Sequence, residues 1–382
     1  MNNIFDILSV ADKELVHSAM LNFFIESDNW KGDFFDFFEL SKHKKDIFYP
    51  KLEYSCEFKG AKNTKKKRIR FDLVLFRDKD QKKPILVIEN KFKATPTVEQ
   101  LKLYDEFISS EQNSFNGVTK ILFVFSMDSV SGPVIEYCKN NWEIIPYVKV
   151  IDNKPTLLEF LDSKIKEIKY CPTEEREKLF LHDYIKHLNE HQQKLSKLIK
   201  NDVSKFPVYN EAIISRFHYL QFLLFIQKEI FKKIQKTNYE SSTLSLYNDG
   251  GKNILPSVNF WLKIDEDSQG YIYEIGIRAA YASIDGDIFR LGFYYDKEQI
   301  VREVYKNQRD EFFSHLKESL VPLFEKKVKF REFHSNKSSN NKGESVFSVM
   351  TCNLSRLERD DVVEEISEMT ISFFLIIFNY SN

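Results

Sequence analysis

Two acidic residues and a lysine lie in two short apolar stretches near the start of the chain. Asp72 lies within IRFDLVLF (69–76), and Glu89 and Lys91 end the stretch ILVIENK (85–91). Both stretches have the length and composition of β-strands. Side chains alternate along a strand, so Glu89 and Lys91 share one face. These residue types together can bind a divalent metal ion and act on a phosphodiester.

The register between the two strands decides whether the carboxylates meet. A turn centred on residue 81 would set Asp72 opposite Asn90, whose side chain points away from the face of Glu89. A shift of one residue, which the sequence does not fix, sets Asp72 opposite Glu89 or Lys91 instead. In that register two carboxylates converge beside an ammonium. Burying two like charges is costly unless a cation neutralises them, so the pattern predicts a metal ion.

Carboxylate oxygens favour Mg²⁺ or Mn²⁺ as this metal. Such an ion lowers the pKa of a bound water, contacts a phosphate oxygen and stabilises the charge that develops on phosphorus. Lys91 would orient or deprotonate the attacking water and add positive charge near the transition state. The residues therefore predict metal-dependent hydrolysis of phosphodiesters.

The elements around these residues follow the order of an α/β sandwich. Their ranges are a helix over 12–27, strands over 49–58, 69–76 and 85–91, a helix over 95–110, a strand over 119–126, a helix over 131–140 and a strand over 142–150. This order predicts a mixed sheet flanked by helices.

Two motifs carry a resemblance to a known family. F-D-L-V-L-F and I-E-N-K, with seventeen residues from Asp72 to Glu89, resemble the signature of the PD-(D/E)XK nuclease superfamily. In the helix that follows, Gln100-Leu101 and Tyr104 resemble the Q-L-x-x-Y motif of the RecB-like branch.

The opening helix extends this resemblance, because Glu14 with His17-Ser18 is similar to the first-helix motif of uncharacterised bacterial members. The resemblance covers about residues 10–150. The chain departs from the named pattern in having Phe71 where the motif has proline, a position that varies within the superfamily.

The resemblance implies a restriction-endonuclease-like fold and a Mg²⁺- or Mn²⁺-dependent deoxyribonuclease. The implied metal ligands are Asp72, Glu89, the backbone carbonyl of Asn90, and Glu14 directly or through water. The implied catalytic residues are Asp72, Glu89, Lys91, Glu14 and Gln100, with Gln100 supporting the site or a phosphate. Members often act in restriction, repair or defence against phages and mobile DNA, which implies a bacterial defence or mobile-element role.

A basic stretch surrounds the candidate site. Residues 51–100 contain fourteen Lys and Arg against seven Asp and Glu, in a chain whose net charge is −1. Such a stretch predicts a local surface for a polyanion, and solvated hairpin loops are the alternative interpretation. The residues expected to contact nucleic acid are Lys65, Lys66, Lys67, Arg68, Lys93 and Tyr104.

The remainder of the chain predicts a second, α+β unit. Its elements are a helix over about 208–236, strands across 257–296, and helices over about 298–325 and 358–378. We therefore divide the chain into a nuclease core (1–155), a helical linker (156–205) and a C-terminal α+β domain (206–382). The last domain is expected to serve recognition, partner binding or oligomerisation.

The linker contains two histidines with a spacing that a metal site could use. His187 and His191 lie four residues apart on a predicted helix. They lack the Glu of the H-E-x-x-H motif, so a packed or solvated helix face is the better interpretation.

Composition limits where the protein is expected to work. Four cysteines lie far apart without C-x-x-C spacing, and the first residues lack the basic and apolar blocks of a signal peptide. The apolar run 371–378 is too short to span a bilayer. These features predict a cytoplasmic protein without a membrane partner.

The assembly and the substrate are less closely defined by the sequence. A homodimer is expected if both strands of DNA are cut, because such nucleases often pair two active sites. Two alternatives to a deoxyribonuclease stay open. One is a ribonuclease, and the other is a non-catalytic nucleic-acid-binding or assembly protein that has kept the fold.

Overall fold

A computed structural model divides the chain into two units, Met1–Ser196 and Lys197–Asn382. Each unit has its own β-sheet. The residues that the structure describes are 13–28, 30–59, 66–110, 114–167, 172–200, 206–210, 212–235, 244–248, 257–263, 277–296, 311, 314–315, 318–319, 333–334, 344–357 and 359–381.

The first unit is built on a five-stranded sheet whose strands lie side by side in chain order. The strands are β1 (Tyr49–Lys59), β2 (Lys66–Phe76), β3 (Pro84–Lys91), β4 (Thr119–Ser126) and β5 (Glu143–Val148). The first three pair antiparallel, whereas β3, β4 and β5 pair parallel. Parallel neighbours need a crossover, and α4 (Val98–Ile108) and α5 (Gly132–Cys138) provide the two crossovers. The mixed sheet predicted from the sequence is confirmed.

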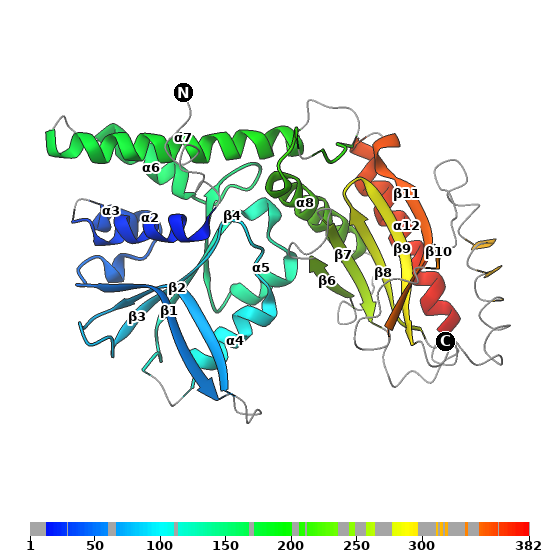
Figure 1. The fold of residues 1–382 in the computed structure, drawn as a ribbon, viewed down its shortest axis with the longest axis horizontal. Helices are drawn as coiled ribbons and strands as arrows, with labels where there is room; N and C mark the ends of the chain where they lie inside the picture. The colour runs from blue at the N-terminus through cyan, green and yellow to red at the C-terminus, as the bar shows by residue number, and fades with distance from the viewer. Residues whose placement is uncertain are drawn as a thin grey trace. The chain divides into compact units, whose positions relative to one another are not determined.

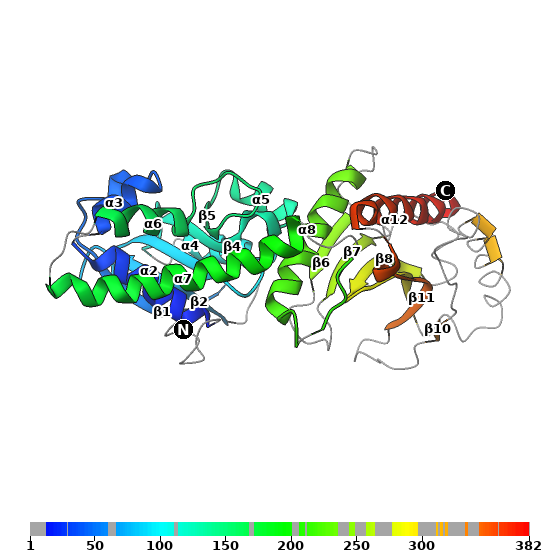
Figure 2. The ribbon, with the colours of Figure 1, turned by 90° about the horizontal axis from the view of Figure 1, so that it is seen from above.

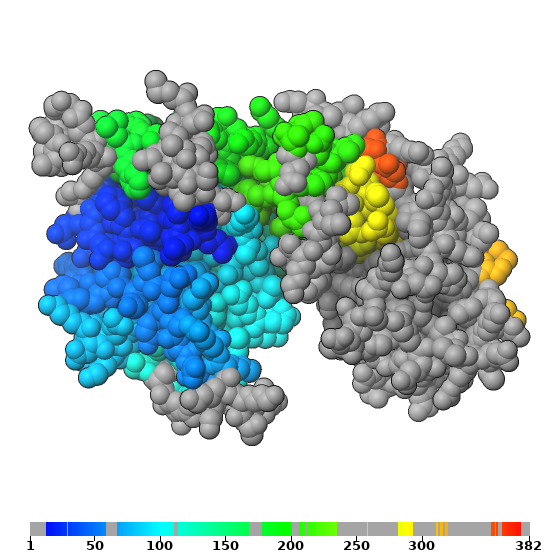
Figure 3. All heavy atoms as spheres, in the orientation of Figure 1, coloured from blue at the N-terminus to red at the C-terminus, as the bar shows by residue number. Residues whose placement is uncertain are grey.

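Helices cover both faces of this sheet (Figure 1). One face carries α4 and α5, and the other carries α2 (Glu14–Glu26), α3 (Lys31–Phe37), α6 (Leu157–Glu167) and α7 (Pro172–Lys200). Helix α7 runs along α2 and α6 (Figure 2), and His17 Nδ1 lies 2.8 Å from the Tyr184 hydroxyl oxygen. On the surface, α2 and α3 lie next to β1 and β2 (Figure 3). These layers form a restriction-endonuclease-like α/β fold.

The segment 156–205, predicted as a helical linker, holds α6 and α7. Four apolar residues of α6 are buried, namely Leu157, Leu158, Phe160 and Leu161. Their burial explains why α6 packs on β5 instead of extending into solvent.

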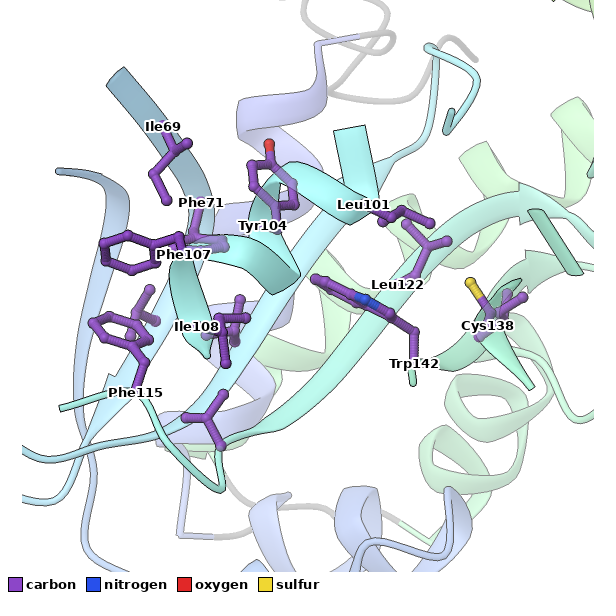
Figure 4. Close-up of a cluster of buried hydrophobic side chains, with 14 of the residues drawn as sticks. Ile69, Phe71, Leu101, Tyr104, Phe107, Ile108, Phe115, Leu122, Cys138 and Trp142 are labelled. Carbon is purple, nitrogen blue, oxygen red and sulfur yellow. The ribbon is translucent and has the colours of Figure 1, made fainter. Parts of the chain in front are cut away.

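A core of aromatic and aliphatic side chains lies between α4, α5 and the sheet (Figure 4). Thr97 caps α4 by accepting a hydrogen bond from the Gln100 N–H, which satisfies a donor at the start of the helix. The apolar stripe of α4 faces the sheet. On β2, Phe71 packs against Tyr104 and Phe107, with ring centroids 4.8 and 5.8 Å apart. Full burial of each such side chain contributes about 1.5–3 kcal/mol, so this core fixes α4 over the sheet.

The opposite face carries a buried cluster of aromatic rings and histidines. His17 on α2 stacks on Phe92, directly after β3, with ring centroids 3.5 Å apart. His187 and His191 also pack on Phe92, and their own ring centroids are 4.3 Å apart. No group of three or more His, Cys, Asp or Glu among the described residues is placed to hold a metal. The two histidines therefore lie on a packed helix face.

A β-bulge sets the register between β2 and β3. Leu73 pairs with Ile88, and the register shifts between Leu75 and the residue after it. Continued by one residue beyond Leu73, the pairing places Asp72 beside Glu89. The hairpin thus adopts a register in which the two carboxylates meet.

The second unit has an α+β arrangement around a six-stranded sheet. The order in this sheet is β10 (Phe333–His334), β11 (Glu344–Asn353), β9 (Ile288–Asp296), β8 (Ile277–Asp285), β7 (Ser257–Lys263) and β6 (Leu244–Asn248). Neighbouring strands are antiparallel. Two helices, α8 (Arg216–Gln235) and α12 (Arg359–Ser381), pack against each other and against the sheet. The α+β class predicted for this half is confirmed.

One predicted helix of the second unit, over 298–325, lies outside the described residues apart from five positions. None of the described helices combines the length and the apolar character needed to cross a bilayer.

Candidate active site

Asp72, Glu89 and Lys91 converge where β2 and β3 lie side by side. Lys91 Nζ is 2.5 Å from Glu89 Oε1, and the two side chains are 11% and 2% exposed. The backbone N–H of Asn90 donates to Asp72 Oδ2 at 2.6 Å. The structure therefore brings together the two carboxylates and the ammonium that the sequence pattern predicts as one cluster.

The two oxygens of the Glu89 carboxylate have different surroundings. Oε1 accepts hydrogen bonds from Gln100 Nε2 at 3.0 Å and from the Tyr104 hydroxyl at 3.1 Å, besides its ion pair with Lys91. Oε2 is buried and has no hydrogen-bond partner among the described residues. A buried carboxylate oxygen without a partner is costly, so Oε2 marks a place where a further ligand would be stabilised.

The cluster shifts the pKa of each of its members. Burial raises the pKa of Glu89 to about 7 against the opposing charge of Lys91, and the Asp72 carboxylate adds to the rise. Burial also raises the pKa of Asp72, although the Asn90 N–H and Lys91 oppose it. Burial alone would lower the pKa of Lys91, but the charges of Glu89 and Asp72 outweigh it and the pKa is raised. A bound cation would favour the charged form of both carboxylates and so oppose the rise in pKa that burial causes.

Glu14, the first residue of α2, contacts the chain that leaves β3. Its Oε1 accepts hydrogen bonds from the backbone N–H groups of Lys93 at 3.3 Å and Ala94 at 2.8 Å. Among the described residues no three acidic side chains form a metal-binding group, so Glu14 does not complete such a group with the other two carboxylates. The Glu14 carboxylate is instead held by the backbone of the chain that follows β3.

The residues present fit a hard divalent cation. Asp72 and Glu89 offer carboxylate oxygens, and Oε2 of Glu89 is without a partner among the described residues. Mg²⁺ is commonly bound by one or two carboxylates and several waters, so these side chains with the Asn90 backbone carbonyl are a sufficient set. Mn²⁺ accepts the same oxygen donors.

Tyr104 is not placed to contact nucleic acid, and that prediction is wrong. Its ring is 5% exposed and packs in the core next to Phe71 (Figure 4). Its hydroxyl oxygen lies 3.1 Å from both Glu89 Oε1 and the backbone oxygen of Arg70. Gln100, four residues earlier on the same helix face, donates to that hydroxyl oxygen at 2.7 Å. Tyr104 therefore supports Glu89 from inside the protein.

The other predicted phosphate contacts lie at the beginning of β2 and after β3. Lys65 lies outside the described residues, and only the backbone of Lys66 is described. Lys67 Nζ forms an ion pair with Glu106 of α4 at 3.7 Å. The side chains of Arg68 and Lys93 are exposed. An exposed cation can meet a phosphate, so these two residues keep the role predicted for them as a proposal.

Sequence reasoning missed the buried polar groups behind the site. The Asn90 side chain points away from Glu89, as predicted, but it is bonded to Ser18 on α2 and to Tyr147 on β5. These partners are distant in the sequence, so no local spacing marks them.

The first unit has a mixed sheet with helices on both faces, and its two carboxylates lie on neighbouring strands. These features define its class as the restriction-endonuclease-like α/β fold. A family model described as PD-(D/E)XK nuclease superfamily matches residues 2–194, just over half of the chain. The chain belongs to the PD-(D/E)XK nuclease superfamily. Neither a curated protein nor a solved structure matches it. Membership indicates a nuclease with a nucleic-acid substrate, and superfamily members generally use divalent metals.

Replacing Tyr104 by Phe removes one donor from Glu89 Oε1 and keeps the packed ring. We expect cleavage at limiting Mn²⁺ to fall by about tenfold, the lower end of the effects found for groups that orient metal ligands. The measurement is the initial cleavage rate across a Mn²⁺ titration. Tyr137→Phe is the matched control, because the Tyr137 hydroxyl also donates to a carboxylate, that of Asp105, at 2.5 Å. Equal rates for Tyr104→Phe and wild type would contradict the orienting role.

Proposed function

We propose that this protein is a Mg²⁺- or Mn²⁺-dependent deoxyribonuclease whose active site is formed by Asp72, Glu89 and Lys91. The observation that supports this most directly is the buried Oε2 of Glu89, which has no hydrogen-bond partner among the described residues. A purely structural ion-pair network would be expected to satisfy both oxygens of a buried carboxylate. A metal-binding carboxylate instead keeps one oxygen for its ligand.

Asp72, Glu89 and the backbone carbonyl of Asn90 would hold the metal. A divalent cation bound there would stabilise the charge that develops on the phosphate and lower the pKa of water. Gln100 and Tyr104 donate to Oε1 of Glu89, which favours Oε2 as the oxygen that faces the metal.

Lys91 provides positive charge from the protein itself. Although burial opposes it, the surrounding carboxylates raise the pKa of Lys91, which favours the charged form. An ammonium carries three N–H donors, so Lys91 can bond Glu89 and also orient the attacking water or a phosphate oxygen. A charged Lys91 is suited to this orienting role and not to taking a proton from water.

The biological setting is proposed from the superfamily and from the composition of the chain. DNA is the proposed substrate, with RNA as the alternative, and the exposed cations near β2 and β3 would contact phosphates. We assign the C-terminal domain (206–382) to recognition, partner binding or oligomerisation. We propose that the protein is a cytoplasmic homodimer that acts in bacterial defence or mobile-element biology.

The experiment that tests this function is cleavage of supercoiled plasmid, single-stranded DNA and RNA by the full chain with Mg²⁺, with Mn²⁺ and with a chelator. Metal-dependent cutting of DNA by wild type, absent from a folded Asp72→Ala protein, is the expected result. Cutting of RNA alone would show that the substrate is RNA instead of DNA, and the assignment of the active site would stand. Absence of both cutting and Mn²⁺ binding in folded wild type would favour the non-catalytic alternative.

Removing the positive charges at the beginning of β2 tests the phosphate contacts. A protein with Lys65, Lys66, Lys67 and Arg68 all replaced by Ala should bind DNA more weakly, because fewer phosphates are neutralised and fewer counterions are released. The slope of log affinity against log salt should fall by about one unit for each phosphate that the protein no longer binds. Binding of a catalytically inactive protein is measured by fluorescence anisotropy at several salt concentrations.

The matched control replaces Lys82 and Lys83, two exposed lysines in the turn at the other end of β2. This variant also loses positive charge, but its slope of log affinity against log salt should stay closer to the wild-type slope than that of the four-residue variant. Equal slopes for wild type and the four-residue variant would remove the phosphate-contact assignment.

A further inference from the structure

Asn90 is the middle residue of the E-N-K motif, and its side chain is fully buried on the face of β3 opposite the carboxylates. Its Nδ2 donates to the backbone oxygen of Glu14 at 2.9 Å and to Ser18 Oγ at 3.0 Å. Its Oδ1 accepts a hydrogen bond from the Tyr147 hydroxyl at 3.1 Å. One carboxamide therefore joins α2, β3 and β5.

The chemistry of these partners specifies asparagine at this position. A backbone carbonyl can only accept, so the nitrogen of the carboxamide must face Glu14, and both of its N–H groups are used. An aspartate of the same shape would lack both donors, and an aliphatic residue would leave Ser18 and Tyr147 without this partner in a buried place. Ser18 and Tyr147 are 2% and 0% exposed, so water does not readily replace the bonds.

The same residue is bonded to the site through its backbone. The Asn90 N–H donates to Asp72 Oδ2, and its carbonyl is the proposed third metal ligand. Glu14, whose backbone oxygen Asn90 holds, uses its carboxylate to accept from the N–H groups of Lys93 and Ala94. Rotation of the Asn90 peptide would therefore disturb Asp72, the carbonyl ligand and the start of α2 together.

We propose that the Asn90 carboxamide is a positioning group for the metal centre, which it serves by anchoring its own peptide and Glu14 to the buried face of the sheet. This inference rests on the proposed function, because it assumes that the cluster binds a divalent cation. It assigns a role in metal affinity to a side chain that lies on the other face of the strand from the carboxylates.

The test measures Mn²⁺ binding to the full chain by isothermal titration calorimetry, together with the melting temperature of each variant. Asn90→Asp should weaken Mn²⁺ binding by about 10–100-fold, the range for groups that orient metal ligands. Ser18→Ala and Tyr147→Phe each remove one partner and leave Asn90 in place, so we expect smaller losses in the same direction. Higher Mn²⁺ should restore cleavage in these two variants, which a general loss of folding would not allow.

Tyr184→Phe is the matched control for Tyr147→Phe. Tyr184 is fully buried in the same unit, and the contact described for its hydroxyl is with His17 Nδ1, at 2.8 Å. Mn²⁺ affinity should therefore stay at the wild-type value in this variant.

The outcomes separate this inference from the function on which it rests. Wild-type Mn²⁺ affinity in folded Ser18→Ala and Tyr147→Phe would overturn the positioning role while leaving the nuclease proposal intact. No Mn²⁺ binding by wild type would refute the proposed metal centre itself, and the role of Asn90 with it. If Asn90→Asp does not fold, the two milder variants still decide the question.

Discussion

Lys91→Met is expected to reduce the rate of DNA cleavage by about 10²–10³-fold, the range for loss of one preorganised electrostatic group. The ammonium lies 2.5 Å from Glu89 Oε1, so its removal takes away positive charge at the place where phosphate would bind. Met keeps much of the side-chain volume, which limits the change to the charge. The same substitution leaves Glu89 without its cation, and such a break in a buried pair destabilises by roughly 3–5 kcal/mol. We expect the lower end, because Glu89 can take up a proton when its pKa is already about 7.

The measurement is a single-turnover cleavage rate at saturating Mn²⁺, with calorimetric unfolding of the same sample. Lys120→Met is the matched control. Lys120 lies on β4 of the same sheet, and its Nζ forms an ion pair with Asp105 of α4 at 2.7 Å. These side chains are 18% and 17% exposed. This control should lose stability but keep the cleavage rate. Equal falls in rate for the two variants would show that the loss reflects weakened folding and not the chemistry of Lys91.

The strands that carry the site could be predicted because each is a short apolar run with charged residues at a recognisable position. The predicted range 69–76 lies within β2, and 85–91 matches β3 to within one residue. Their register could not be predicted, because it depends on a bulge between the Leu75–Leu86 and Phe76–Pro84 pairs. A proline in that place is compatible with the first residue of a regular strand as well as with a bulge. The convergence of Asp72 and Glu89 is therefore a property of the folded hairpin.

Helix α4 shows a signal that the sequence contained and the prediction for Tyr104 did not use. Leu101, Tyr104 and Ile108 follow the spacing of a buried helix face, and all three are buried. A tyrosine on that stripe is more readily a support for Glu89 than a contact for nucleic acid. By contrast, the partners of Asn90 depend on how α2 docks on the sheet, which is a tertiary property without a local pattern.

The double variant Glu89→Gln/Lys91→Met should recover the stability that Lys91→Met loses and should remain inactive. Replacing both members of a buried ion pair by neutral residues of similar volume is often neutral or stabilising by about 1–4 kcal/mol, whereas removing one member is not. The amide oxygen introduced at position 89 could still accept from Gln100 and Tyr104, which are the donors to Oε1 in wild type. Cleavage and stability would then change independently at one site.

The stability difference between the double variant and wild type should depend on pH, because Glu89 titrates in wild type and is absent from the variant. In metal-free protein, burial raises the pKa of Glu89 from 4.5 to about 7 on folding, so the folded state binds more protons than the unfolded state between these values. The free energy of unfolding contributed by Glu89 therefore falls as pH rises from about 4.5 to 7, and then stays at the lower value. The double variant lacks this carboxyl, so its advantage over wild type should grow through that window and should shrink when Mn²⁺ is added to wild type. The contrary result is a difference in free energy of unfolding between the two proteins that stays constant from about pH 4.5 to 7 with chelator present. It would mean that the Glu89 carboxylate does not destabilise the metal-free fold.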